Sequence, residues 1–388
     1  MRRCQVFPPR LELDGSPTME ELIAALNALK RGKAGGKTGL LPEMLLYGGT
    51  GLFDRLLQVM QDVWRSGRVV EDWKNAVIVP IPKKGDLRKC DNWRGISLLD
   101  VAGKVFARVI QGRLQAIAED ILPESQCGFR KGRGCTDMIF VARQLVEKCR
   151  EHNDALFALF VDLRKAYDSV PRSALWSVLE RYGVPPTMLS IIRSFHSGMQ
   201  AEVRIGDATT EKIIVNNGLR QGCTLAPSLF NIYFGAVVAY WRARCPEAGV
   251  MVKYKHGRKL VGDRTAMSRL NKIKVTESQF ADAAALYSTS RDAFESTTQK
   301  FIDTASHWGL TVSIHKTKGM SINSHLVPED TQPVHTAEGE IEMVNNFTYL
   351  GSNITVDGEI RDEVKCHIAR AAKAFGCLQG SFQIGDFN

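Results

Sequence analysis

Two aspartates stand where buried strands are expected to end, and their carboxylates are the first candidates for chemistry. Asp162 follows the apolar run Ala155–Val161, and Asp282 lies within the short apolar segment Gln279–Tyr287. A carboxylate beside an apolar core is costly unless it is paired or binds a metal. Two such acids, brought together by the fold, can hold two divalent cations for phosphoryl transfer. For Asp162 taken alone, capping of the following segment is the competing interpretation.

A glycine-rich loop, Gly218–Phe230, lies between the two acids in the sequence. Gly218 and Gly222 permit a close approach of the backbone to a ligand. The amide of Gln221 offers both donors and an acceptor, and Pro227 fits the first turn of the helix that follows. A plain loop that leads into a helix is the alternative interpretation.

Taken in order, these segments resemble the motifs of reverse transcriptases from non-LTR retrotransposons of the long interspersed element type. Phe160–Val170 resembles the first palm motif, and Gly218–Phe230 resembles the family's Gly-x-x-Gln-Gly-x-x-x-Ser/Ala-Pro loop. Phe280–Asp282 resembles the start of the Phe-Ala-Asp-Asp hairpin, whose second aspartate is replaced here by Ala283. The resemblance extends over nearly the whole chain, from about residue 18 to about residue 375.

The resemblance implies a two-metal polymerase site. Asp162 and Asp282 would be catalytic and would bind Mg²⁺ (or Mn²⁺). Lys316 is the candidate proton donor to the leaving pyrophosphate, with Lys318 as its rival. The missing acid at Ala283 is expected to weaken the metal pair and to lower the rate by ~10²-fold or more. Whether Ala283 is an engineered change or natural decay is left open.

The same resemblance assigns further positions to the substrates. The nucleotide-binding set consists of Lys83 and Arg94, expected on the triphosphate, Tyr167, expected under the sugar where its ring would block a 2′-hydroxyl, and Gln221, expected at the template–nucleotide pair. The template- and primer-binding set consists of Arg130, Lys131, Arg133, Tyr349, Leu350 and Gly351. For each of these residues, an ordinary structural role is the competing interpretation, such as a solvated lysine or a core tyrosine.

The composition fits a globular protein that binds a polyanion. The 388 residues are 44% hydrophobic and 24% charged, with a net charge of +9. Basic residues cluster at Lys30–Lys37, Lys83–Arg94, Arg130–Arg133 and Lys253–Lys274. Such clusters favour nucleic acid, with a merely solvated basic surface as the alternative. The expected partners are an RNA template, a DNA primer and a deoxynucleoside triphosphate, with no membrane.

The cysteines and the apolar segments bear on the cellular compartment. Nine cysteines are scattered without metal-ligand spacing, which is typical of a reducing environment. The first residues contain no apolar signal core, and no apolar stretch approaches the ~20 residues of a membrane span. We therefore expect an intracellular location, nuclear, cytoplasmic or both.

The apolar patterns predict a mixed α+β fold, and the resemblance implies a right-hand polymerase with fingers, a ferredoxin-like antiparallel palm and a partial thumb. Helices are expected from Thr18 and over about 52–66, 101–119, 141–151, 171–182, 185–195, 225–243, 291–308 and 360–378. Strands are expected at 76–82, at 155–161, in a hairpin of 201–205 with 212–215, in the hairpin 279–288 and near 341–350, whereas 250–274 is left unassigned. The expected domains are an extended lead-in (1–17), fingers (18–154), palm with insertions (155–340), and primer-grip region with thumb stub (341–388), most of the thumb being absent.

Three functions follow from this sequence. The first is an RNA-directed DNA polymerase that is impaired by Ala283. The second is a catalytically dead relic that keeps its basic surface for RNA. The third, an RNA-templated RNA polymerase, is disfavoured by Tyr167 and by the Gln-Gly pair at Gln221.

Overall fold

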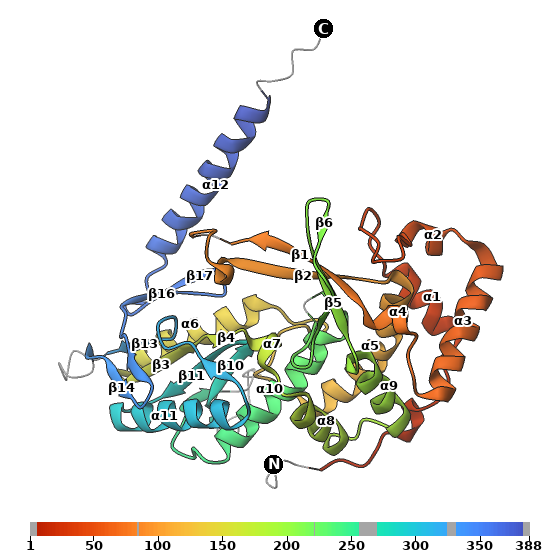
Figure 1. Ribbon diagram of the computed structural model, residues 1–388. Helices are drawn as coiled ribbons and strands as arrows, with labels where there is room; N and C mark the ends of the chain where they lie inside the picture. The colour runs from red at the N-terminus through yellow and green to blue at the C-terminus, as the bar shows by residue number, and fades with distance from the viewer. Residues whose placement is uncertain (1–5, 84, 221, 256–269, 324–330, 383–388) are drawn as a thin grey trace, which may run out of the picture. The chain divides into compact units, whose positions relative to one another are not determined.

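The architecture is taken from a computed structural model that describes residues 6–83, 85–220, 222–255, 270–323 and 331–382 (Figure 1). The chain divides into two compact units. The first unit comprises Met1–Lys131, Leu163–Ala243 and Ile302–Thr311, and the second comprises Gly132–Asp162, Arg244–Phe301 and Val312–Asn388. Neither unit is one continuous segment of sequence, so long-range contacts build both of them.

The second unit is centred on a four-stranded sheet in the order β10-β11-β3-β13 (Figure 1). Its strands are β3 (Leu156–Val161), β10 (Glu277–Phe280), β11 (Ala283–Ser288) and β13 (Lys318–Ile322), and all neighbours are antiparallel. Every residue of β3 is buried. The reason is that β11 and β13 flank this strand, α6 (Cys135–His152) packs on it, and Phe157 contacts Phe294 of α11 (Arg291–His307). A strand covered on both faces requires a continuous apolar run, which the sequence supplies.

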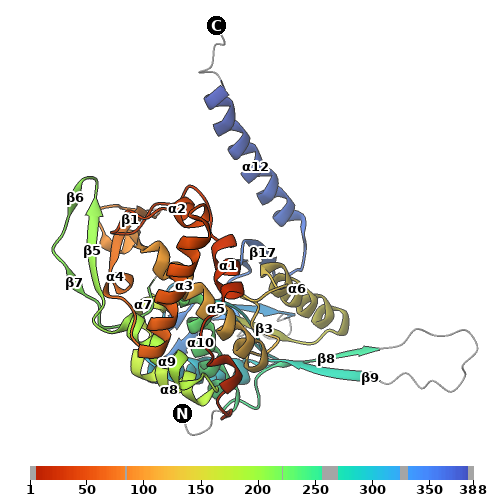
Figure 2. The same cartoon turned by 90° about the vertical axis from the view of Figure 1, so that its right-hand side faces the viewer.

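Two-stranded hairpins and a C-terminal helix complete the second unit. The hairpins are β8 (Val250–Lys255) with β9 (Leu270–Val275), β14 (Val334–Thr336) with β15 (Gly339–Ile341), and β16 (Asn346–Tyr349) with β17 (Ser352–Thr355). The helix is α12 (Arg361–Phe382). Figure 2 shows β8 and β9 leaving the sheet region as a long, narrow ribbon.

The first unit begins with helices that pack on one another. They are α1 (Met19–Asn27), α2 (Pro42–Leu46), α3 (Gly49–Ser66), α4 (Glu71–Lys74) and α5 (Val101–Ile121), with short 3₁₀ turns at Leu11–Leu13 and Cys90–Asn92. Thr18 caps α1 through the expected capping box, in which Glu21 accepts the Thr18 backbone N–H at 3.0 Å. Between α4 and α5 lie β1 (Ala76–Pro82) and β2 (Trp93–Leu99), which pair antiparallel.

The remainder of the first unit carries the short elements around the glycine-rich loop. The strands are β4 (Leu163–Arg164), β5 (Gln200–Ile205), β6 (Ala208–Thr209) and β7 (Ile213–Ile214), and β12 (Thr311–Val312) begins at the last residue of this unit's final segment. Strand β5 pairs in parallel with β1. The helices are α7 (Ala166–Ser169), α8 (Arg172–Arg181), α9 (Pro186–His196) and α10 (Ala226–Arg242). Helix α10 is buried around most of its circumference, as expected of a helix that is apolar on nearly all sides.

The expected α+β class is confirmed, and most expected elements are present with shifted ends. Helix α6 starts at Cys135 rather than 141, because the Asp137 carboxylate accepts the Gly134 N–H at 2.7 Å and stabilises an earlier first turn. The hairpin after β5 is also different. Its turn pairs Ile205 with Ala208, and the strand expected at 212–215 is the separate β7, which pairs with the start of β5.

Two further segments differ from the sequence-based expectations. The unassigned region 250–274 contains β8 and β9, and residues 256–269 of it lie outside the described residues. The strand expected near 341–350 is split between the end of β15 and the whole of β16. Within the residues that the structure describes, no helix is both long enough and apolar enough to cross a membrane.

Candidate active site

The residues around Asp162 come from three neighbouring strands of the second unit. Asp162 directly follows β3, whose last residue, Val161, pairs with Ala284 of β11. Continuing that register by one residue puts Ala283 opposite Asp162. On the other side of β3, Phe160 pairs with Lys318 of β13, and continuing that register by two residues puts Lys316 opposite Asp162. Asp162 thus lies between Ala283 and the candidate proton donor.

Asp282 lies in the turn that joins β10 to β11. Phe280 pairs with Ala283, so Ala281 and Asp282 form a two-residue connection. Ala281 has φ 55°, a left-handed conformation that disfavours a residue with a side chain. Such strain is retained where the surrounding structure determines the conformation, and it concentrates at functional sites. The turn holds Asp282 at the same end of the sheet as Asp162.

The backbone around Asp162 is fixed by the segment that precedes β13. The Asp162 N–H donates to Thr317 Oγ1 at 3.2 Å, and the Asp162 carbonyl accepts the Ser313 N–H at 2.8 Å. The Lys316 ammonium lies 3.7 Å from Asp162 Oδ2, with side-chain exposures of 73% and 44%. An ion pair this exposed contributes little to stability, so the ammonium can move to a substrate.

The two candidate lysines have different environments. The Lys318 ammonium lies 2.6 Å from Glu342 Oε2, and its side chain is only 22% exposed. Lys318 is therefore held by a carboxylate of its own, whereas Lys316 is directed toward Asp162. This difference supports Lys316 over its rival.

The expected primer-grip segment forms the β16–β17 hairpin. Tyr349 pairs with Ser352, so Leu350 and Gly351 form the turn, with φ values of 50° and 92°. Two positive φ values in a two-residue loop are typical of the type I′ turn, whose twist matches that of the strands. The Gly351 carbonyl accepts a hydrogen bond from Arg370 of α12 at 3.2 Å.

This hairpin packs on β3, the strand that Asp162 directly follows. The Phe347 ring stacks on Phe160 at 4.5 Å, and the Tyr349 ring lies 5.2 Å from Phe160. The Tyr349 hydroxyl and the Ser278 hydroxyl of β10 are 3.0 Å apart. Since Phe160 lies two residues before Asp162, side chains at both positions share one face of β3.

In the first unit, the glycine-rich loop packs on the segment that carries Tyr167. The Tyr167 carbonyl accepts the Leu219 N–H at 2.8 Å, and the Tyr167 ring stacks on Phe230 of α10 at 4.7 Å. Gly218 has φ 76°, and a Cβ there would lie 2.5 Å from the Asp168 carbonyl oxygen. Only glycine permits this approach.

The other end of the loop lies against β2. A Cβ on Gly222, whose φ is 106°, would lie 2.6 Å from the Ser97 carbonyl oxygen. Arg94 is exposed on the same strand. Gln221 itself lies outside the described residues. The Lys83 N–H donates to the Asn92 carbonyl at 2.7 Å, so the ends of β1 and β2 stay together.

Lys83 also acts on the segment after Asp162. Partial burial raises the pKa of Asp168, while the positive charges of Lys165 and Lys83 act in the opposite direction. The positive charge of Lys83 thus lies close enough to α7 to act on the Asp168 carboxylate. Lys83, which follows β1, and Lys165, which precedes α7, therefore both act on the Asp168 carboxylate in the same unit.

Sequence reasoning missed two arginines that hold the glycine-rich loop, of which the half-buried Arg172 is the first. Its Nε donates to the Gly218 carbonyl at 3.0 Å, and Nη1 donates to the carbonyls of His196 at 2.6 Å and Val215 at 2.9 Å. Its Nη2 donates to the Asn217 carbonyl at 3.2 Å. Burial lowers the pKa of Arg172 to about 10, so the guanidinium remains charged at neutral pH.

The second arginine, Arg220, is buried and holds the other side of the loop. Its guanidinium donates to the carbonyls of Trp73 at 3.3 Å and Lys74 at 2.8 Å, and to that of Phe195. Burial lowers its pKa. The available signal was an arginine directly before Gln221, but an isolated arginine in a loop does not indicate burial.

The basic segment after α5 is only partly available to a ligand. The Arg130 side chain is 3% exposed and lies 2.7 Å from the Glu119 carboxylate. It also donates to the carbonyls of Pro123 at 2.8 Å and Gln126 at 3.0 Å. Arg130 therefore closes its own loop, and Lys131 is an exposed cation beside it. Arg133, in the second unit, is half-buried.

The donor set fits a divalent cation shared with substrate. Among the described residues, no group of three or more His, Cys, Asp and Glu side chains forms a metal-binding cluster. The candidate site has two carboxylates, Asp162 and Asp282, with Ala283 at the next position. Magnesium is commonly bound by one or two carboxylates together with substrate phosphates and water, and manganese accepts the same oxygen ligands.

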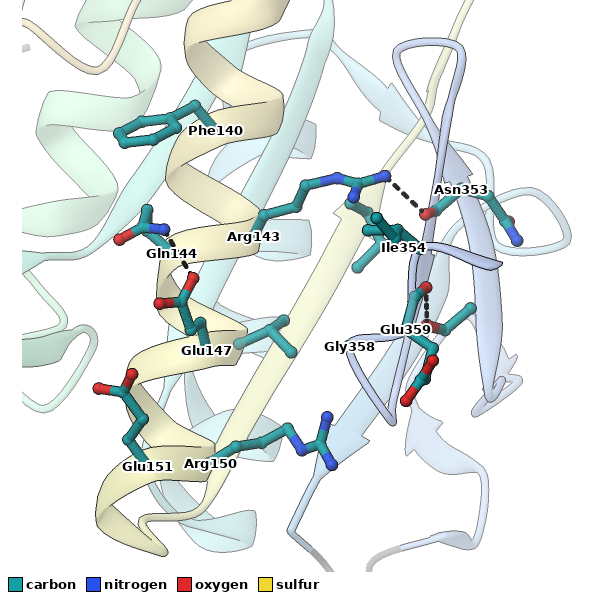
Figure 3. A pocket seen from close by; sticks show the side chains of 13 residues that line it. Phe140, Arg143, Gln144, Glu147, Arg150, Glu151, Asn353, Ile354, Gly358 and Glu359 are labelled. Carbon is teal, nitrogen blue, oxygen red and sulfur yellow. Dashed lines mark hydrogen bonds between the residues drawn. The ribbon is translucent and has the colours of Figure 1, made fainter. Parts of the chain in front are cut away.

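A separate pocket of about 420 Å³ lies between α6 and the segment from Asn353 to Ile360 (Figure 3). Two of its polar side chains form hydrogen bonds within the pocket: Arg143 donates to the Asn353 carbonyl at 3.4 Å and Gln144 to Glu147 at 2.8 Å. None of the candidate site residues lines this pocket.

The chain is similar to known proteins over much of its length. The family model described as "Reverse transcriptase (RNA-dependent DNA polymerase)" matches residues 81–354. The chain is 28% identical over 227 residues to the Transposon TX1 uncharacterized 149 kDa protein of Xenopus laevis, covering 58% of this chain and 17% of that protein. It is 30% identical over 166 residues to the Retrovirus-related Pol polyprotein from type-1 retrotransposable element R2 of Popillia japonica, covering 42% of this chain and 23% of that protein.

The chain thus spans about a fifth of the length of these two relatives, at 17% and 23%. Among solved structures, telomerase from Candida tropicalis, in complex with the TWJ fragment of telomeric RNA, has a TM-score of 0.47 and 15% identity, covering 79% of this chain and 47% of that one.

Proposed function

The chain belongs to the reverse transcriptase (RNA-dependent DNA polymerase) family, and from that premise we propose that it is the RNA-directed DNA polymerase part of a non-LTR retrotransposon protein. The observation that carries the proposal is the arrangement at the end of β3. There, Asp162, the turn holding Asp282, and Lys316 come from adjacent strands, with 3.7 Å between the Lys316 ammonium and the Asp162 carboxylate.

Asp162 and Asp282 would hold Mg²⁺ or Mn²⁺. A bound divalent cation lowers the pKa of an attacking hydroxyl and neutralises charge on the triphosphate. Lys316 would donate a proton to the leaving pyrophosphate, because its ammonium is exposed and close to Asp162. The exposed Arg94, with Lys83, would bind the triphosphate, since a guanidinium bonds phosphate in a bidentate manner.

The remaining roles concern the nucleic acids. The ring of Tyr167, held against Phe230, would exclude a 2′-hydroxyl from the sugar site, and Gln221 would contact the template–nucleotide pair. The turn of Tyr349, Leu350 and Gly351 would hold the primer end. Lys131 and Arg133 would bind template phosphates.

The proposal also covers the domain boundaries and the cellular location. We infer fingers at 18–154, palm at 155–340 and primer grip with thumb stub at 341–388 from the family motifs. The described cysteines, Cys90, Cys127, Cys135, Cys149, Cys223, Cys245, Cys366 and Cys377, are all free, which supports a reducing, intracellular site of action.

A second candidate function is a nucleic-acid-binding protein without catalysis, favoured by the absent carboxylate at Ala283. Primer extension separates the two, with the chain and its Ala283→Asp variant supplied with magnesium and then with manganese. Extension by either protein, abolished by Asp162→Asn, is the result expected of a polymerase. If neither protein extends a primer to which it binds tightly, the binding function stands and the polymerase proposal fails.

A further inference from the structure

The β8–β9 ribbon carries its lysines on one face. Lys253 pairs directly with Lys272, and Met251 pairs with Lys274. Alternate residues of a strand point to the same face, so Lys253, Lys272 and Lys274 share it. The side chains of these three lysines are all exposed.

The other face of the ribbon is apolar. It carries Val250, Val252, Ile273 and Val275. Val250 is 5% exposed where the ribbon leaves the second unit, whereas Ile273 further along is 50% exposed. Because the apolar face is buried at its base, the strand pairing fixes the lysine face toward solvent.

The lysine face brings like charges close together. Side chains directly opposite in an antiparallel pair lie ~4.5–5.5 Å apart, and like charges there are destabilising. Among the residues that the structure describes, neither Lys253 nor Lys272 forms an ion pair. The Lys274 ammonium donates to the Pro246 carbonyl at 2.5 Å, which fixes a third positive charge beside the pair.

The lysine face does not continue into the groove beside the ribbon. An adjoining groove of about 500 Å³ is lined by Lys253 together with Lys148, His152 and Asp154. Lys148 is already paired with Glu151 at 2.7 Å. With Asp154 also present, the groove has no excess of positive charge to extend the lysine face.

We propose that the lysine face of β8–β9 binds the phosphate backbone of RNA outside the candidate active site. This RNA-binding proposal rests on the proposed function only in that the proposed function makes RNA a ligand of the chain. Lysine ammonium groups are compact charges that bind phosphate without reading bases, so binding is independent of sequence. The pair Lys253–Lys272 and the fixed Lys274 lie two residues, or ~7 Å, apart along the strand, which presents successive charges to a flexible backbone.

Salt titration of RNA affinity tests the proposal. The probe is a single-stranded RNA, and the variant is Lys253→Gln with Lys272→Gln. We expect the slope of log affinity against log salt to fall by about 1.4 in magnitude, since each lost phosphate contact on a single strand removes ~0.7. The control Arg55→Gln with Arg68→Gln removes the same charge from exposed positions of the first unit and should leave the slope nearly unchanged.

The charge-retaining variant Lys253→Arg with Lys272→Arg should keep the parental slope. An unchanged slope in the glutamine variant would overturn the proposal. Binding of phosphatidylserine vesicles that depends on the two lysines, with an unchanged RNA slope, would assign the face to a membrane instead.

The outcome is separable from that of the polymerase proposal. In an Ala283→Asp background, the ribbon variant should still add a single nucleotide to a bound primer–template. If that background extends no primer while the salt slope still falls, the polymerase proposal fails and the RNA-binding ribbon stands.

Discussion

Ala283 bears most directly on the chemistry of the site. The register puts it opposite Asp162 and next to Asp282. In the proposed two-metal site, a carboxylate there would add negative charge that offsets the mutual repulsion of the two cations. We expect Ala283→Asp to raise single-nucleotide incorporation under enzyme excess by ~10-fold or more, with primer–template affinity little changed.

The matched control for that variant is Ala283→Asn, which has nearly the same shape and no charge. It should incorporate nucleotides no faster than the parent. Equal gains in both variants would show that side-chain size, and not the added charge, limits the reaction.

Lys316 is tested against the neighbouring Lys318. Lys316→Ala should lower the single-turnover rate by about 10²-fold, because general acid catalysis contributes at least that much. Lys318→Ala removes the ion pair with Glu342 and should leave the rate nearly unchanged. Rates are measured with primer–template bound, in the Ala283→Asp background. A loss confined to Lys318→Ala would reverse the assignment.

The candidate site could be predicted from the sequence only where a motif names a residue. Asp162, Asp282 and Lys316 were identified that way, and the strand register brings them to one end of the sheet. The contacts of Arg130 could not be foreseen, because its partner Glu119 and the carbonyl groups it binds are set by the loop conformation.

At the scale of elements, the patterns that specify a single element were reliable. The capping box of α1, the buried run of β3 and the apolar circumference of α10 are all visible in the sequence. The strand β7 and its antiparallel pairing with β5 were expected, whereas the two-residue strand β6 was missed, because so short a strand carries no period of its own and follows from its pairing with β5.

The loop from Val215 to Arg220 is an element held by arginine side chains in addition to a few backbone hydrogen bonds. Arg172 alone donates to four carbonyl groups, of which Gly218 and His196 are two. Arg172→Lys should lower the free energy of unfolding by about 1–3 kcal/mol, since an ammonium cannot span the fork of acceptors and leaves partly buried carbonyls unpaired. Urea unfolding measures the change, with Arg55→Lys as the exposed control. If Arg172→Lys lowers the free energy of unfolding no more than Arg55→Lys does, the loop keeps its conformation without Arg172.

At the scale of the whole molecule, the α+β class followed from the alternation of helical and strand patterns, but the sheet order did not. Strand β3 pairs with β11 and β13, both of which are more than a hundred residues away in sequence. Non-local pairing of this kind leaves no trace in local periodicity. The division into fingers, palm and thumb stays a prediction.

The stability of the whole protein should depend on pH through His196. This side chain is 2% exposed, and burial, followed by the charge of Arg220, lowers its pKa to about 3. The unfolded chain binds a proton near pH ~6.5, whereas the folded chain stays neutral down to about pH 3. The unfolded state therefore holds more protons below pH ~6.5, so stability is full above that value and is lost as the pH falls.

The expected loss between about pH 7.5 and about pH 5 is ~2 kcal/mol, from 1.36 kcal/mol for each pH unit below the unfolded pKa. His196→Phe, which cannot titrate, should remove this slope while its ring still packs against Trp176, whose ring centroid lies 5.5 Å from that of His196. Urea unfolding at several pH values measures both proteins. The carboxylates with lowered pKa, such as Glu21, add their own loss only nearer their usual pKa, and the difference in slope between parent and variant above pH ~5 isolates the histidine from Asp168, whose pKa is raised. Equal slopes for parent and variant would mean that the imidazole reaches water and charges without unfolding the protein.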